Sequence, residues 1–202
     1  MAKAVIFDVG KVLYDWEPRF LYERLIADDR ALDVFLRDVV TKEWHFQHDA
    51  GRPFAETRRE LTALHPEHAD LIALWGPRFL DSIGDPIPGM AAIVDELDAA
   101  AVPLFAITNF SGEFWPPFRA REAALFDRFR DVVVSGDEKL TKPHAAIYHV
   151  ALERFGLAPE DAVFVDDSPA NVAGANAVGM HGVSFADAMT LRGDLVEFGL
   201  LR

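Results

Sequence analysis

Polar side chains follow four short apolar segments of this 202-residue chain. The segments and the residues after them are Ala4–Phe7 with Asp8, Pro103–Ile107 with Thr108 and Asn109, Val132–Val134 with Lys142 a few residues on, and Ala162–Val165 with Asp166 and Asp167. Each segment is rich in Val, Ile or Phe and too short for a helix, which predicts a strand buried on both faces. Because parallel strands end at the same edge of a sheet, we expect these polar residues to share one crevice.

This combination of side chains favours phosphate chemistry. Three clustered carboxylates raise each other's pKa, and a bound cation relieves their repulsion. Because the chain has no Cys and these donors are all oxygen, the expected ion is Mg²⁺, which keeps positions open for a phosphate oxygen. We therefore predict a small anionic substrate, with Lys142 and Thr108 directed at its charge. Asp8 is then placed to attack phosphorus and form an aspartyl phosphate that water hydrolyses.

The elements that must position these residues alternate between strand and helix. Helical patterns cover Met90–Ala101, Ala145–Phe155 and Pro169–Val178, and a weaker fifth strand is expected at Gly182–Phe185. This alternation predicts an α/β fold with a Rossmann-like parallel sheet.

Residues 15–86 interrupt the alternation of strand and helix. They contain four helical patterns and no convincing strand; the patterns are Pro18–Ala27, Arg30–Gln47, Phe54–Leu64 and Glu67–Ile83. We therefore predict a core of residues 1–14 and 87–202, with a helical cap of residues 15–86 inserted after the first strand. Such an insertion lies over the carboxyl ends of the strands, where open sheets bind ligands.

Charge and hydropathy exclude several classes of partner. The chain has 33 acidic and 20 basic side chains, a net charge of −13, which disfavours a nucleic-acid partner. The longest apolar run, Ala99–Ile107, is far shorter than the ~20 residues that a membrane span needs. The first ten residues do not resemble a secretory signal, so we expect a soluble, cytoplasmic protein. The oligomeric state stays open.

The same residues carry a family resemblance. Val5-Ile6-Phe7-Asp8-Val9-Gly10-Lys11-Val12-Leu13, Ile107-Thr108-Asn109, Lys142-Pro143 and Phe164-Val165-Asp166-Asp167 resemble, in order and spacing, the four motifs of the haloacid dehalogenase (HAD) superfamily of hydrolases. The resemblance covers the whole chain and implies the HAD fold with a helical cap. It implies that Asp8 is the nucleophile and that Thr108, Asn109 and Lys142 hold the transferring group. It also implies that Asp8, the backbone carbonyl of Gly10, Asp166 and Asp167 bind Mg²⁺.

Gly10 departs from the family pattern. Most phosphatases that this sequence resembles have a second Asp at this position, which protonates the leaving group and then activates water. General acid–base catalysis of this kind contributes typically ~10²–10⁴-fold. A cap residue is one replacement, because Glu43, His45, His48 and Asp49 gather near Gly51. We take His48 as the candidate acid and base, since imidazole titrates near neutral pH.

Three functions fit these residues. The favoured one is a phosphatase for a small phosphorylated metabolite, including sugar phosphates, whose anomeric oxygen leaves easily. The second is a metal-independent 2-haloacid dehalogenase that uses Asp8 as nucleophile and a cap arginine for the substrate carboxylate; the candidates are Arg19, Arg24, Arg37 and Arg52. Against it, Gly10 stands where dehalogenases usually have Tyr, Thr108 where they have Ser, and they lack an acidic pair. The third is a non-catalytic binding module.

Aromatic residues of the cap and of one core loop are expected to set the substrate. Trp16, Trp44, Phe46 and the loop Phe110–Trp115 are predicted to line the entrance to the site. An aromatic wall suits a sugar ring or an organic acid, although aromatic residues also pack protein interfaces.

Overall fold

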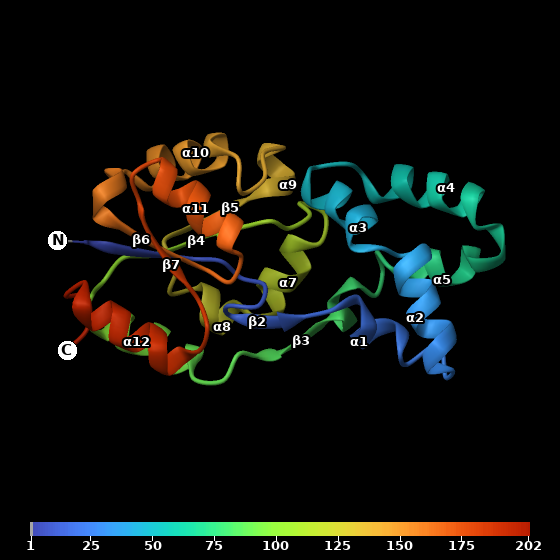
Figure 1. The fold of residues 1–202 in the computed structure, drawn as a ribbon, viewed down its shortest axis with the longest axis horizontal. Helices are drawn as coiled ribbons and strands as arrows, with labels where there is room; N and C mark the ends of the chain where they lie inside the picture. The colour runs from blue at the N-terminus through green and yellow to red at the C-terminus, as the bar shows by residue number, and fades with distance from the viewer. Residues whose placement is uncertain (1) are drawn as a thin grey trace.

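The computed structural model describes residues 2–202 and contains a five-stranded parallel sheet (Figure 1). The strand order is β5-β4-β1-β6-β7, with bounds β1 Ala4–Phe7, β4 Leu104–Thr108, β5 Asp131–Val134, β6 Ala162–Asp166 and β7 His181–Ser184. All five predicted strands are present, and the predicted α/β class is confirmed.

Helices cover both faces of this sheet, which explains why β1 is buried at every residue. Alternate side chains of a strand point to opposite faces. Val5 and Phe7 pack in one apolar cluster, whereas Ala4 and Ile6 pack in another. The helices of the core are α6 Met90–Ala99, α7 Trp115–Arg121, α8 Ala123–Phe126, α9 Ser135–Glu138, α10 Ala145–Phe155, α11 Pro169–Ala177 and α12 Ala188–Glu197, with a 3-10 turn η3 at Pro159–Asp161.

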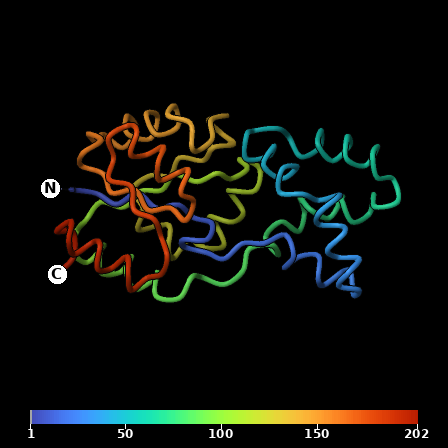
Figure 2. The backbone as a smooth tube through the Cα atoms, viewed as in Figure 1, coloured from blue at the N-terminus to red at the C-terminus, as the bar shows by residue number. Residues whose placement is uncertain are grey.

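A group of helices lies beyond the carboxyl end of β1, at the opposite end of the molecule from both termini (Figure 2). Its elements are α1 Pro18–Tyr22, α2 Asp29–Asp38, α3 Lys42–Asp49, α4 Phe54–Leu64 and α5 Ala69–Leu74, with 3-10 turns η1 Pro66–His68 and η2 Phe79–Ser82. We call this group the cap helices. They occupy the segment that the sequence assigns to an insertion.

A two-stranded ribbon joins the cap helices to the core. Strands β2, Tyr14–Trp16, and β3, Ile83–Pro86, pair antiparallel with a shift of register. The expectation that residues 15–86 contain no strand is therefore wrong. Each strand is very short, and Gly84 and Pro86 are residues that disfavour strands, so local sequence carries little signal for this pairing.

Two predicted cap helices are broken into shorter ones. The pattern over Arg30–Gln47 forms α2 and α3, because the Thr41 side chain accepts a hydrogen bond from the Trp44 amide (3.0 Å) and starts a new helix. The pattern over Glu67–Ile83 divides into η1, α5 and η2. Within residues 2–202, no helix is long and apolar enough to cross a membrane.

Candidate active site

The carboxyl ends of β1 and β6 carry the acidic residues of the site. Asp8 directly follows β1, and Asp166 is the last residue of the adjacent strand β6. Lys142, from the loop between α9 and α10, places its Nζ 2.9 Å from Asp8 Oδ1 and 2.7 Å from Asp166 Oδ2. All three side chains are buried, so the structure brings these residues together as the strand order predicts.

Neighbouring side chains hold this arrangement in place. The Asn109 amide donates to the Lys142 carbonyl (3.1 Å), and its oxygen accepts from the Lys142 backbone N–H (2.9 Å). Asn171 Nδ2 lies 3.0 and 3.1 Å from the two Asp166 oxygens. Asn109, which the resemblance assigns to the transferring group, therefore also fixes the loop that carries Lys142. Thr108, at the end of β4, is buried beside it.

Burial and mutual charge set the electrostatics of the cluster. Burial, and after it the charge of Asp166, raise the pKa of Asp8 to about 7, although Lys142 opposes both. Burial alone lowers the pKa of Lys142, but the charges of Asp8 and Asp166 outweigh it and raise that pKa overall. Burial and then Asp166 also raise the pKa of Asp167. The cluster therefore has excess negative charge that a cation would neutralise.

The carboxylates have a geometry that fits a metal ion. Asp8, Asp166 and Asp167 each offer an oxygen, and these oxygens lie within 4.8 Å of one another. An all-oxygen donor set suits a hard divalent cation such as Mg²⁺.

Gly10 lies in the turn after β1, and a Cβ added there would meet no atom within 4 Å. The place where phosphatases of this kind usually have their second Asp is therefore open space.

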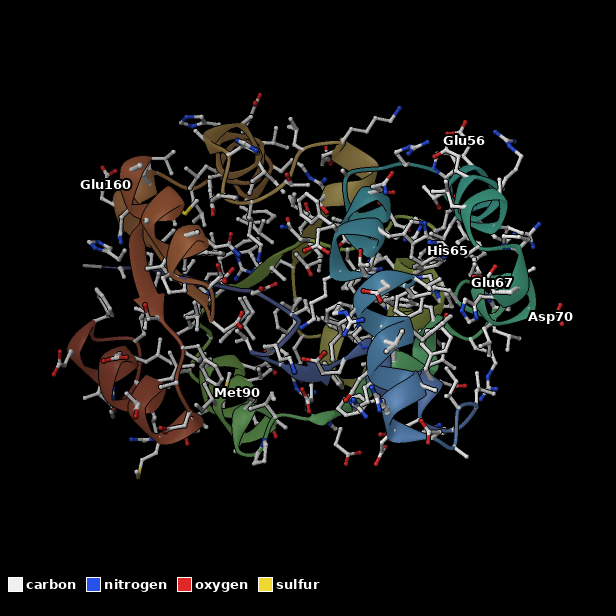
Figure 3. The ribbon with its side chains drawn as sticks, turned by 45° about the vertical axis from the view of Figure 1, so that its right-hand side comes forward. Glu56, His65, Glu67, Asp70, Met90 and Glu160 are labelled. Atoms are coloured by element: carbon white, nitrogen blue, oxygen red, sulfur yellow. The ribbon has the colours of Figure 1, made fainter. Side chains whose placement is uncertain are left out.

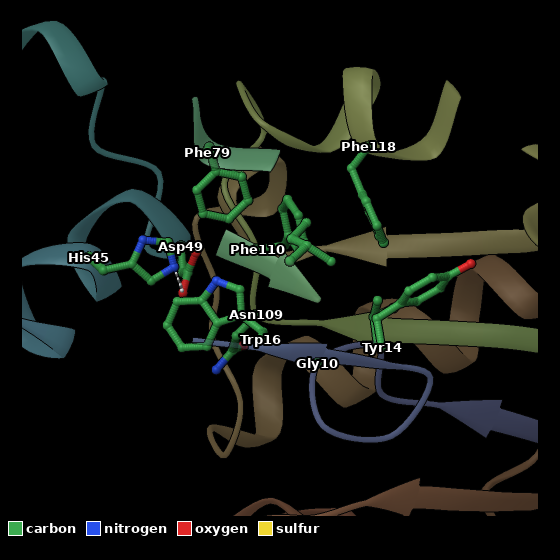
Figure 4. Close-up of a pocket in the computed structure, with 11 residues that line it drawn as sticks. Gly10, Tyr14, Trp16, His45, Asp49, Phe79, Asn109, Phe110 and Phe118 are labelled. Carbon is green, nitrogen blue, oxygen red and sulfur yellow. Dashed lines mark ion pairs between the residues drawn. The ribbon is translucent and has the colours of Figure 1, made fainter. Parts of the chain in front are cut away.

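A cavity of about 80 Å³ adjoins Gly10, between the core and the cap helices (Figure 4). Its labelled lining residues are Gly10, Tyr14, Trp16, His45, Asp49, Phe79, Asn109, Phe110 and Phe118. Trp16 and Phe110 line the cavity as predicted. Trp44 packs instead against Trp75, with ring centroids 6.2 Å apart, and Phe46 is 44% exposed on the outer side of α3. Phe79 and Phe118 contribute to the wall without a local sequence signal, because their positions depend on how η2 and α7 pack.

No Lys or Arg of residues 2–202 lines this cavity. Three predicted substrate arginines form surface ion pairs with acidic residues of their own region: Arg19 with Asp33, Arg37 with Asp38, and Arg52 with Glu60. The fourth, Arg24, lines a separate groove with Glu23 and Asp85. None of the four is placed to hold a substrate carboxylate beside Asp8, because their charges are compensated or directed elsewhere.

His48 does not line the cavity. It is 1% exposed, and its Nε2 lies 2.6 Å from Thr57 Oγ1 on α4. Burial lowers its pKa to about 4, so it is neutral near pH 7. The prediction of His48 as acid and base is therefore not supported, because this side chain is buried against Thr57 and does not reach the cavity. The same helix presents His45 and Asp49 to the cavity, one turn apart, with Nε2 and Oδ2 3.4 Å from each other.

The fold and this strand-end cluster define a haloacid dehalogenase-like hydrolase. The model of that family matches residues 2–179, and the chain belongs to it. The protein is therefore an enzyme, a hydrolase.

Individual relatives agree with this assignment. The chain is 30% identical to hexitol phosphatase A of Escherichia coli over 188 residues, which cover 89% of this chain and 81% of that protein. It is 26% identical to the sesquiterpene phosphatase astK of Aspergillus oryzae over 193 residues, covering 93% and 91%. A predicted HAD-like hydrolase from Porphyromonas gingivalis has the same fold, with a TM-score of 0.73, 22% identity and 98% of each chain covered.

Proposed function

We propose that this hydrolase is a Mg²⁺-dependent phosphatase for small phosphorylated metabolites and acts through an aspartyl phosphate on Asp8. One observation carries the proposal: Lys142 Nζ lies between Asp8 and Asp166, and the oxygens of Asp8, Asp166 and Asp167 converge within 4.8 Å. A dehalogenase, which needs no metal, has little use for this acidic cluster. Relatives that are named as phosphatases support the same choice.

Each residue of the cluster has a role in this proposal. A carboxylate oxygen of Asp8 attacks phosphorus, and the bond to the leaving-group oxygen breaks. The Lys142 ammonium and the Thr108 hydroxyl hold the oxygens of the transferring phosphoryl group. Asp8, the Gly10 carbonyl, Asp166 and Asp167 would hold Mg²⁺, which supplies positive charge to the phosphate when bound. Water then cleaves the Asp8–phosphorus bond and releases inorganic phosphate.

The cavity beside Gly10 suggests which leaving groups are accepted. Its wall is aromatic and contains no cationic side chain from the described residues, so a second negative charge on the substrate would be left unpaired there. An uncharged leaving group, such as a sugar ring or an apolar alcohol, fits this wall. The relatives differ on this point, because one is named for hexitols and another for sesquiterpenes.

We also propose that the cap helices and the core are separate structural units. The predicted boundaries at residues 14/15 and 86/87 fall within or directly after the β2–β3 ribbon. This ribbon would act as the connection through which the cap helices move relative to the core when substrate enters.

Hydrolysis of p-nitrophenyl phosphate tests the proposed function. We expect turnover with Mg²⁺, loss of turnover with EDTA, and a loss of at least ~10⁴-fold in Asp8→Asn, because the nucleophile is removed. The thermal melt of this variant controls for folding. Activity that survives EDTA, or halide release from 2-chloropropionate without metal, would contradict the proposal.

A further inference from the structure

Gly10 leaves the proposed phosphatase without its usual proton donor, and the structure contains a carboxyl group on the opposite wall. Asp49, the last residue of α3, lines the same cavity as Gly10. It is 5% exposed, and its Oδ1 has no hydrogen-bond partner. A buried carboxyl oxygen without a partner is costly in a folded protein, which points to a function for it.

We propose that Asp49 is the catalytic acid and base of this enzyme, supplied by the cap helices in place of the Asp that Gly10 replaces. This inference rests on the proposed phosphatase function. It makes the docking of α3 against the core a requirement for proton transfer.

Contacts between the cap helices and the core fix the position of Asp49. The hydroxyl of Ser135, the first residue of α9, donates to the Asp49 backbone carbonyl (2.6 Å) and accepts from the Phe110 amide (2.9 Å). Gly51 follows with φ +89°, and a Cβ there would lie 2.8 Å from the Gly136 carbonyl oxygen. This close approach requires glycine, and it holds the end of α3 directly on the core.

The surroundings of the Asp49 carboxyl favour its protonated form. Burial raises its pKa well above the usual value, and the charge of Asp8 adds to this, while Lys142 and the backbone N–H of Ser111 oppose both. The carboxyl end of a helix also disfavours a negative charge. His45 is the remaining titratable neighbour, and burial lowers its pKa to about 3, so it stays neutral. A protonated carboxyl beside the leaving group is the state that a general acid requires.

The proton balance closes over two steps. In the first, Asp8 forms a bond to phosphorus while the phosphorus–oxygen bond to the leaving group breaks, and Asp49 gives its proton to that oxygen. In the second, the Asp49 carboxylate takes a proton from water, the resulting hydroxide oxygen bonds to phosphorus, and the bond to Asp8 breaks. The sum is phosphate ester plus water giving alcohol plus inorganic phosphate, with Asp49 protonated again.

His45 is a positioning residue in this scheme. Its Nε2 lies 3.4 Å from Asp49 Oδ2, and its ring stacks near Phe79 (centroids 5.5 Å apart) and Trp16 (4.9 Å). The imidazole therefore neighbours Oδ2, and Oδ1 is the carboxyl oxygen left for the substrate.

The test compares two leaving groups in Asp49→Asn, which keeps the size of the side chain and removes the proton. Butyl phosphate has a poor leaving group, so with Mg²⁺ we expect its turnover to fall ~10²–10⁴-fold. p-Nitrophenolate leaves without a proton, so its first release should persist as a burst equal to the enzyme concentration. Slow steady turnover should follow, with phosphate trapped on Asp8.

Asp70→Asn is the matched control, because it makes the same change at an exposed position on the outer cap surface (Figure 3). Should Asp49→Asn fail to fold, Asp49→Ser is measured in the same way. Unchanged butyl phosphate turnover, or equal loss of the burst and of steady turnover, would overturn the role of Asp49. A wild-type enzyme that releases no phosphate from either ester would instead overturn the proposed function.

Discussion

The core and the cap helices contribute very different side chains to the candidate active site. The core carries the paired charges of the strand-end cluster, with Lys142 between Asp8 and Asp166, and none of these three residues lines the cavity beside Gly10. The cap side carries Phe79 and the neutral His45, and Asp49 is its one acidic group among the described lining residues. In our proposals the core therefore binds the phosphoryl group, and the cap helices contact the leaving group and supply its proton.

The difference has a physical basis in how each region is built. Strand ends of a parallel sheet meet at one edge, so the core can gather opposite charges and hydrogen-bond each of them. The cap helices meet the core through packed side chains, where an unpaired charge would be expensive. Apolar rings fill this interface, with Phe79 and Phe114 stacked 4.6 Å apart.

Removing the central cation should have the largest effect on stability. Lys142→Met leaves Asp8 and Asp166 buried without their cationic partner, so we expect a loss of ~3–5 kcal/mol, measured by urea unfolding at pH 8 without metal. The control is Lys3→Met, because Lys3 makes a 2.8 Å ion pair with Asp161 at the surface. A similar, small change in the free energy of unfolding of both variants would contradict the stabilising role of Lys142 in the buried cluster.

Adding a cation to the cavity wall at the β2–β3 ribbon should change specificity. Trp16→Arg places a positive charge on the partly exposed edge of the cavity. The new charge should attract a substrate that carries a carboxylate by ~1.4 kcal/mol. We therefore expect the ratio of kcat/KM for a carboxylate-bearing phosphate ester to kcat/KM for butyl phosphate to rise about tenfold. Trp16→Gln controls for loss of the ring. An identical ratio in both variants would argue against charge selection by this wall.

The smallest expected effect concerns Asp49 and pH. Because the folded state raises the pKa of this carboxyl, it binds the proton more tightly than the unfolded chain does. The contribution of Asp49 to stability therefore falls as pH rises from about 3.8 through the folded pKa. Asp49→Asn removes that loss, so the Tm of the variant should exceed the wild-type Tm at pH 8, and by less at pH 5. A difference in Tm that shrinks with rising pH would contradict this.

The sequence predicts the core more closely than the cap helices. All five sheet strands lie within one or two residues of their expected ranges, because short runs such as Ala4–Phe7 are buried on both faces and leave an unambiguous apolar signal. The polar residues after them converge because strand direction alone determines where they meet. In the cap, amphipathic patterns identify the helices but not the break at Thr41 between α2 and α3. The short β2–β3 ribbon has no alternation of apolar and polar residues that would predict it.

The choice between His48 and Asp49 illustrates the limit of sequence reasoning. The two residues are consecutive on α3, and the ordinary pKa of imidazole favours His48 as the catalytic acid and base. Only the packing of α3 against α4 and against Ser135 decides that His48 faces Thr57 and that Asp49 faces the cavity. Burial then lowers the pKa of His48 and raises that of Asp49, because it favours the neutral form of each side chain.

The amino-acid sequence by itself determined the parallel sheet, the family and the set of acidic and basic side chains at the strand ends. These depend on local apolar runs and on the residue that follows each run. The tertiary structure alone decided the shape and charge of the cavity wall and which cap residue reaches it. Those properties depend on the packing of distant segments, such as η2 against the loop after β4, which no local pattern encodes.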